Sequence, residues 1–96
     1  MKHISILGST GSIGTQALEV VRANPERYKV DALTAQHNAD LLIAQALEFK
    51  PELVVIGNKK LYQQVKSALT NTKVIAGEDG LIAAVQLPQT QVVLTA

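Results

Sequence analysis

The chain has 96 residues and a net charge of +1, with 47% hydrophobic and only 3% aromatic residues. This length suits one domain, and the apolar share excludes a disordered tail and predicts an aliphatic core. The near-neutral charge excludes electrostatic attraction as the main source of affinity for nucleic acid or an anionic membrane, and the absence of cysteine excludes disulfides and thiolate metal sites.

The first elements are a short strand and a helix. Met1 stands three residues before an apolar run that ends at Gly8, which leaves no room for a signal or transit peptide. A helix over residues 12–24 should follow, and its expected buried face is Ile13, Ala17, Val20 and Val21. Asn24-Pro25 should end this helix, because proline disfavours helical geometry in the residue before it. No apolar stretch is long enough to span a membrane, so we expect a cytoplasmic protein.

The later elements repeat the same alternation. A second strand is expected over residues 30–35, and Asn38 is placed to cap the helix that follows. The continuous apolar run of residues 53–56 is typical of a strand covered on both faces. A helix over 61–69, a strand over 74–76, a short helix over 81–85 and a strand over 92–94 complete the series. Glu78 and Asp79 should stabilise the first turn of the short helix.

Strand and helix therefore alternate without a hairpin signal, which predicts a parallel sheet with right-handed crossovers. We predict an α/β, Rossmann-like fold of about five strands with helices on both faces. The first strand should be central, with the second to fourth on one side and the fifth on the other. The last run, residues 92–96, has the apolar character of a central strand, but no helix follows to cover it. We therefore interpret residues 1–96 as the N-terminal part of an NAD(P)-binding domain.

The turn from Gly8 to Gly14 lies between the first strand and the first helix. Gly8 should allow a sharp turn, Gly11 a close approach of phosphate to the backbone, and Gly14 tight packing of the helix on the strand. This placement inside a strand–turn–helix unit predicts a site for the pyrophosphate of a dinucleotide. The Gly-x-x-Gly-x-x-Gly spacing recurs in families that use NADP.

Three residues between these glycines are also candidate ligands. The hydroxyl groups of Thr10 and Ser12 stand beside the free N–H groups of the first helical turn, at the positive end of the helix dipole. Ile13 should supply an apolar contact and begin the buried face of the helix.

The end of the second strand should hold the adenosine ribose. An NAD-binding site usually carries an acidic residue here, but residues 34–38 contain none. Asn38 and a partly protonated His37 could instead accept a 2′-phosphate, so we predict NADPH as the cofactor.

Two other patterns in the sequence resemble functional sites but have simpler explanations. Tyr62 and Lys66 have the spacing of the catalytic pair in short-chain dehydrogenases, but they come too early in the chain, and chance spacing on an exposed helix explains them better. His3 has no neighbouring ligand in the sequence and is interpreted as a surface residue.

Taken together, these motifs resemble the 1-deoxy-D-xylulose 5-phosphate reductoisomerase family. The resemblance covers essentially the whole chain and rests on the glycine turn combined with Asn24-Pro25-Glu26 and the ending of the second strand. It continues through residues 47–51, 53–55, 77–81 and 92–96.

The resemblance implies the NADPH-binding portion of an enzyme that rearranges and reduces deoxyxylulose phosphate to methylerythritol phosphate, in non-mevalonate isoprenoid synthesis. It implies cofactor contacts at residues 10–13 and at Gln36, His37 and Asn38. Many family members have Gly where Gln36 stands and Lys or Arg where His37 stands.

The resemblance also implies a homodimer that acts on a phosphosugar with a divalent metal, Mg²⁺ or Mn²⁺. The metal ligands and the substrate site would lie C-terminal to residue 96, so the 96 residues alone should show no turnover. Two alternatives remain: a sugar-nucleotide epimerase or reductase of the extended short-chain type, and a non-catalytic domain that senses a dinucleotide.

Overall fold

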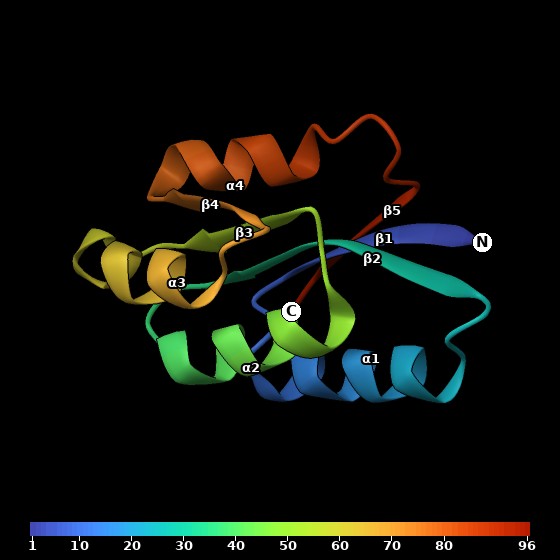
Figure 1. Cartoon of the computed structure of the whole chain (residues 1–96). Coiled ribbons are helices and arrows are strands. Elements are labelled where there is room, and N and C mark those ends of the chain that lie inside the picture. Colours follow the sequence, from blue (N-terminus) through green and yellow to red (C-terminus); the bar gives the residue numbers. More distant parts are fainter.

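A computed structural model describes all 96 residues as a five-stranded parallel sheet with helices on both faces (Figure 1). The elements in chain order are β1 (Lys2–Leu7), α1 (Ser12–Ala23), β2 (Tyr28–Ala35), α2 (Ala39–Phe49), β3 (Leu53–Ile56), a 3-10 turn (Lys59–Leu61), α3 (Tyr62–Ala68), β4 (Lys73–Ala76), α4 (Glu78–Val85) and β5 (Val92–Thr95). No helix has the length and apolar character needed to cross a lipid bilayer.

The strand order is β4-β3-β2-β1-β5, and every neighbouring pair is parallel. From β1 to β4, each new strand is added on the same side of the sheet, and the connecting helices α1, α2 and α3 lie on one face (Figure 1). The chain then crosses back to place β5 on the other side of β1, and the helix of this connection, α4, lies on the other face. The predicted order and the helices on both faces are confirmed. Because the direction reverses beside β1, the carboxyl ends of β1 and β5 form the switch point where such sheets bind ligands.

The core is aliphatic, as the composition predicted. The larger cluster packs α1, α2 and α3 on one face of the sheet, and Ile6, Leu18, Leu42 and Val54 are among its fully buried members. In a smaller cluster on the other face, Ala84 of α4 packs against Ala32, Leu53 and Val55. All four residues of β3 are buried, which agrees with its continuous apolar run.

The predicted buried face of α1 is wrong at two positions. Ile13 is 58% exposed and Val20 is 54% exposed. The residues of α1 that are buried on the sheet are Gly14, Leu18 and Val21, a set rotated by one residue from the predicted face. The reason lies at Gly14, where the missing side chain lets the start of the helix approach the glycine loop.

The last strand lies on the far side of β1 from β2, as predicted. β5 pairs only with β1 and forms an edge of this sheet. Val92 and Val93 are therefore 39% and 40% exposed, although their composition is typical of a buried strand.

Candidate functional site

The three glycines of the loop between β1 and α1 serve different purposes. Gly8 has a positive φ of 77°, which favours glycine. A Cβ at Gly14 would lie on the carbonyl oxygen of Gly8 and only 2.6 Å from the Cα of Ser9. A Cβ at Gly11 would meet nothing closer than 3.6 Å, which is ordinary contact. The fold itself therefore requires Gly8 and Gly14, whereas Gly11 leaves open space above the backbone.

The start of α1 presents unpaired donors beside that open space. The amide N–H groups of Ser12, Ile13 and Gly14 have no hydrogen-bond partner in the protein. Gly11, at the N-cap position, supplies no side-chain acceptor, and the first turn contains no acidic residue. These amides and the positive end of the helix dipole are thus free to bind an anion.

The polar residues Thr10 and Ser12 of the loop flank Gly11 in the sequence. Thr10 is half-buried and Ser12 is exposed. Neither hydroxyl group donates to or accepts from another protein side chain. Ile13 projects from the same turn, so its exposed side chain can contact a ligand and not the core, contrary to the expectation that it begins the buried face.

A buried polar pair holds this loop in place. Ser9 Oγ donates to Gln45 Oε1 at 2.7 Å, and Gln45 Nε2 donates back to the Ser9 carbonyl at 2.9 Å. Thr34 of β2 adds two contacts, through its carbonyl to Ser9 N at 2.8 Å and its hydroxyl to Gly8 N at 3.0 Å. None of these three residues, Ser9, Gln45 and Thr34, is among the predicted site residues. The available signal was Gln45, a polar side chain among the core-facing positions of α2.

The second predicted segment, residues 36–38, lies at the carboxyl end of β2, next to the glycine loop. The Gln36 side chain lies over Gly57, where any Cβ would overlap its amide group. Asn58 Nδ2 lies 3.4 Å from His37 Nδ1, while Asn58 Oδ1 accepts from Lys60 N at 3.0 Å. Asn38 caps α2, as predicted, by accepting from Leu41 N at 3.2 Å.

Two pockets open along this edge of the sheet. One, of about 490 Å³, is mainly apolar and lies between the strand ends and α4, with Gly8, Gln36, Leu81, Ile82 and Val85 among its lining residues. The other, of about 820 Å³, is polar and joins the ends of β2, β3 and β4 to the start of α4. Its walls include Gln36 and His37, the loop 57–60, and Glu78 and Asp79, which occupy the first turn of α4 as predicted.

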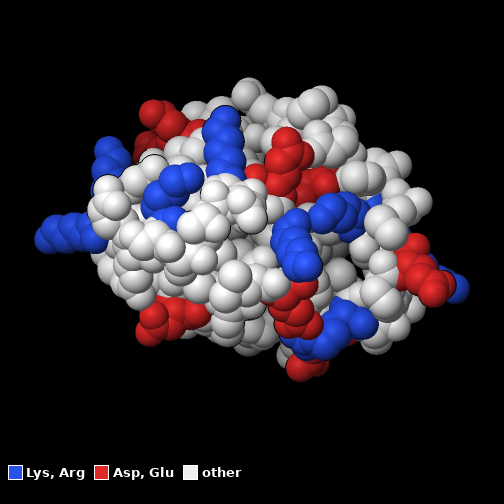
Figure 2. All heavy atoms as spheres, viewed as in Figure 1, with Lys and Arg blue, Asp and Glu red and all other residues white.

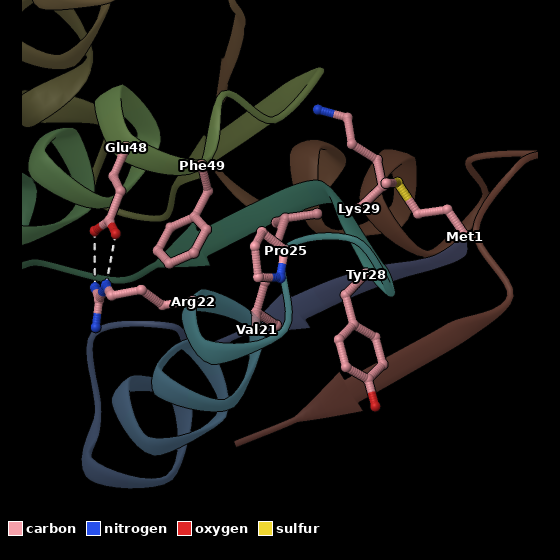
Figure 3. Close-up of a pocket in the computed structure, with 9 residues that line it drawn as sticks. Met1, Val21, Arg22, Pro25, Tyr28, Lys29, Glu48 and Phe49 are labelled. Carbon is pink, nitrogen blue, oxygen red and sulfur yellow. Dashed lines mark hydrogen bonds and ion pairs between the residues drawn. The ribbon is translucent and has the colours of Figure 1, made fainter.

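A third pocket, of about 330 Å³, lies at the opposite end of the sheet (Figure 3). Here Arg22 Nε and Nη2 donate to the two carboxylate oxygens of Glu48 at 2.5 and 2.7 Å, and the guanidinium lies 5.4 Å from the centre of the Phe49 ring. The hydrogen bonds from Arg22 lower the pKa of the Glu48 carboxyl group below its ordinary value. The charges of Arg22 and Glu48 in this pocket are therefore paired with each other.

The His3 side chain is 35% exposed, so it does reach the surface, but it also has a buried partner that the sequence did not indicate. His3 Nδ1 lies 2.8 Å from Oδ1 of Asp31, a side chain that is almost fully buried. Thr90 donates to the other oxygen of Asp31 at 2.7 Å, and its hydroxyl group lies 3.1 Å from that of Ser5. These contacts join β1, β2 and the segment before β5, which are distant in sequence, so His3 has a structural role that local sequence context cannot reveal.

The chain groups no three His, Asp or Glu side chains in a way that could hold a metal ion. Tyr62 packs against the core and Lys66 is exposed, and neither lines a pocket at the carboxyl ends of the strands.

Comparison with known proteins gives a consistent result. Residues 4–96 match the family model for 1-deoxy-D-xylulose 5-phosphate reductoisomerase. The protein of that name from Bacteroides fragilis is 56% identical over 99% of this chain, and the one from Bacteroides thetaiotaomicron is 52% identical over the same share. The chain spans about a quarter of the length of these curated relatives, 25% in each case.

Solved structures agree with the sequence matches. A crystal structure of DOX-P reductoisomerase in complex with NADPH, fosmidomycin and magnesium has a TM-score of 0.92 and 33% identity, covering 97% of this chain and 24% of that one. The reductoisomerase from Zymomonas mobilis in complex with NADPH has a TM-score of 0.87 and 34% identity, covering 92% of this chain and 24% of that one.

Proposed function

Because this chain belongs to the 1-deoxy-D-xylulose 5-phosphate reductoisomerase family, we propose that it forms the N-terminal part of the NADPH-binding domain of such an enzyme. The observation that carries the proposal is the set of unpartnered amides at Ser12, Ile13 and Gly14, which face the open space above Gly11. A pyrophosphate at this place would accept their hydrogen bonds and meet the positive end of the α1 dipole.

The rest of the dinucleotide fits the neighbouring features. The apolar groove beside Leu81, Ile82 and Val85 suits a flat heteroaromatic ring. The ribose of the adenosine half would lie beside Gln36, His37 and Asn38, a segment that carries no acidic residue to bind the ribose 2′-hydroxyl group. We therefore assign the cofactor contacts to the Gly8–Gly14 loop, with Thr10 and Ser12, and to residues 36–38.

For the whole protein we propose the family reaction, the rearrangement and NADPH-dependent reduction of deoxyxylulose phosphate. The names of the relatives support this assignment, and two structural neighbours are complexes with NADPH. A divalent metal would polarise the substrate oxygens, with its ligands in the part of the relatives that this chain does not span. The family resemblance further supports a cytoplasmic homodimer.

The two alternatives have less support. An extended short-chain epimerase or reductase and a dinucleotide-sensing domain would share the glycine loop, but the relatives named above are all reductoisomerases. The family match therefore favours the reductoisomerase.

Calorimetric titration of the chain with NADPH tests the proposed site. Gly11→Val adds a branched side chain where the pyrophosphate would approach, and should weaken NADPH binding by about tenfold or more. Ala23→Val, at the exposed far end of α1, adds bulk to the same helix and should leave the affinity unchanged. Equal affinities for wild type and Gly11→Val would place NADPH elsewhere, and no binding by wild type would contradict the proposed function.

A further inference from the structure

We infer that Lys59 and Lys60, on the loop after β3, hold the 2′-phosphate of NADPH together with His37. The inference rests on the proposed function and adds to it two residues that select the phosphorylated cofactor. Both lysines line the polar pocket of about 820 Å³ that begins at Gln36 and His37, where the adenosine ribose would lie.

The local geometry brings the side chains of His37, Lys59 and Lys60 to one pocket. Asn58 accepts from the backbone N–H of Lys60 through Oδ1, which fixes the orientation of its amide group. Its Nδ2 then faces His37 Nδ1, which must act as the acceptor. In the neutral ring this leaves the proton on Nε2, where it is free to donate to a phosphate oxygen.

Lys59 lies across the mouth of the same pocket. A Cβ built on Gly77 would be only 2.7 Å from Lys59 Cε and 3.7 Å from its Nζ, so the side chain extends over the backbone at the start of α4. Figure 2 shows Lys and Arg side chains at the end of the molecule where α3 begins, with acidic groups beside them near the start of α4.

The ammonium groups of Lys59 and Lys60 form no ion pair within the protein. The ion pairs of the protein are His3–Asp31 and Arg22–Glu48, so neither lysine is paired with an acid. Glu78 and Asp79 line the same pocket at the start of α4. Their carboxylates disfavour a phosphate beside α4, which leaves His37 and the lysines as its partners. A ribose hydroxyl group carries no charge, so NADH gains nothing comparable from this arrangement.

The experiment measures the NADPH and NADH affinities of the full chain by calorimetry, for wild type and for Lys59→Gln, Lys60→Gln and the double variant. Each single change should raise the NADPH dissociation constant about fivefold, as expected for the loss of one exposed charge-assisted hydrogen bond. The NADH constant should change by less than about twofold. Lys73→Gln, which removes a positive charge at the amino end of β4, is the matched control.

Each outcome has a defined meaning. Preferential loss of NADPH affinity, restored by Lys60→Arg, supports the inference, as does a matching loss for 2′,5′-ADP but not for 5′-AMP. Variants that bind NADPH like wild type, or an equal effect of Lys73→Gln, overturn the inference and leave the proposed function standing. A wild type that binds neither NADPH nor NADH overturns both.

Discussion

The polar groups at the two ends of the sheet differ in whether they have partners within the protein. At the amino ends of the strands, Arg22 is paired with Glu48, and His3 and Thr90 both contact Asp31. At the carboxyl ends, the first amides of α1 and the two lysines after β3 have no protein partner. Polar groups that are paired contribute to the stability of the fold, whereas exposed donors without partners are available to a ligand. Substitutions at the amino end should therefore change stability, and those at the carboxyl end should change binding.

The largest expected effect is a loss of stability at Gly14, which is an exception to the rule that the carboxyl end affects binding. Gly14 belongs to the carboxyl end, but Gly14→Ala would place a Cβ against the backbone of Gly8 and Ser9. We expect the free energy of unfolding, measured by urea denaturation, to fall by about 3 kcal/mol. Gly11→Ala, whose Cβ has room, should change it by less than about 1 kcal/mol.

A similar loss of stability in the two glycine variants would contradict the different roles assigned to them. It would mean that Gly11, like Gly14, is required by the packing of the loop and is not kept open for a ligand.

An intermediate effect is expected at the amino end. Asp31→Ala would leave the Thr90 hydroxyl group and the His3 ring without their acceptor. Because Asp31 is buried, the free energy of unfolding should fall by about 2 kcal/mol, as measured by urea denaturation. NADPH affinity should not change under conditions where the variant is folded. A selective loss of NADPH binding would show that the two ends are coupled.

The smallest effect concerns the exposed pair of Arg22 and Glu48. The pKa of Glu48 is lowered in the folded state, so its contribution to stability is present above the ordinary value of 4.5 and is lost as the pH falls through the folded value. Glu48→Gln should therefore lower the Tm slightly at pH 7. Thermal unfolding followed by circular dichroism at pH 7 and in strong acid measures this, and a difference that persists in acid would contradict the assignment.

The sequence predicted the features that depend on local pattern. The alternation of apolar runs was sufficient for a parallel sheet with right-handed crossovers, whereas the strand order and the reversal beside β1 followed from the doubly wound fold that the glycine turn indicates. The positive φ at Gly8 and the close packing at Gly14 followed from the glycine spacing. Asn38 was identified as a cap because its position before a helical run has a direct physical meaning.

Features that depend on partners distant in the chain were not predictable. The sets Ile13–Ala17–Val20 and Gly14–Leu18–Val21 both have helical spacing, and only the approach of α1 to the loop decides between them. His3 meets Asp31 through the pairing of β1 with β2. Lys59 and Lys60 join His37 because β2 and β3 end side by side, which no local motif indicates.

The contact of Gln36 with Gly57 links two loops that lie on adjacent strands. Gln36 is exposed, so the end of its side chain would have to move aside to admit a side chain at position 57. A substitution at position 57 would therefore change where the Gln36 amide group lies, although it leaves the residue itself unchanged. Variants made to alter cofactor preference at position 36 should accordingly be tested together with changes at position 57, because the two positions share this space.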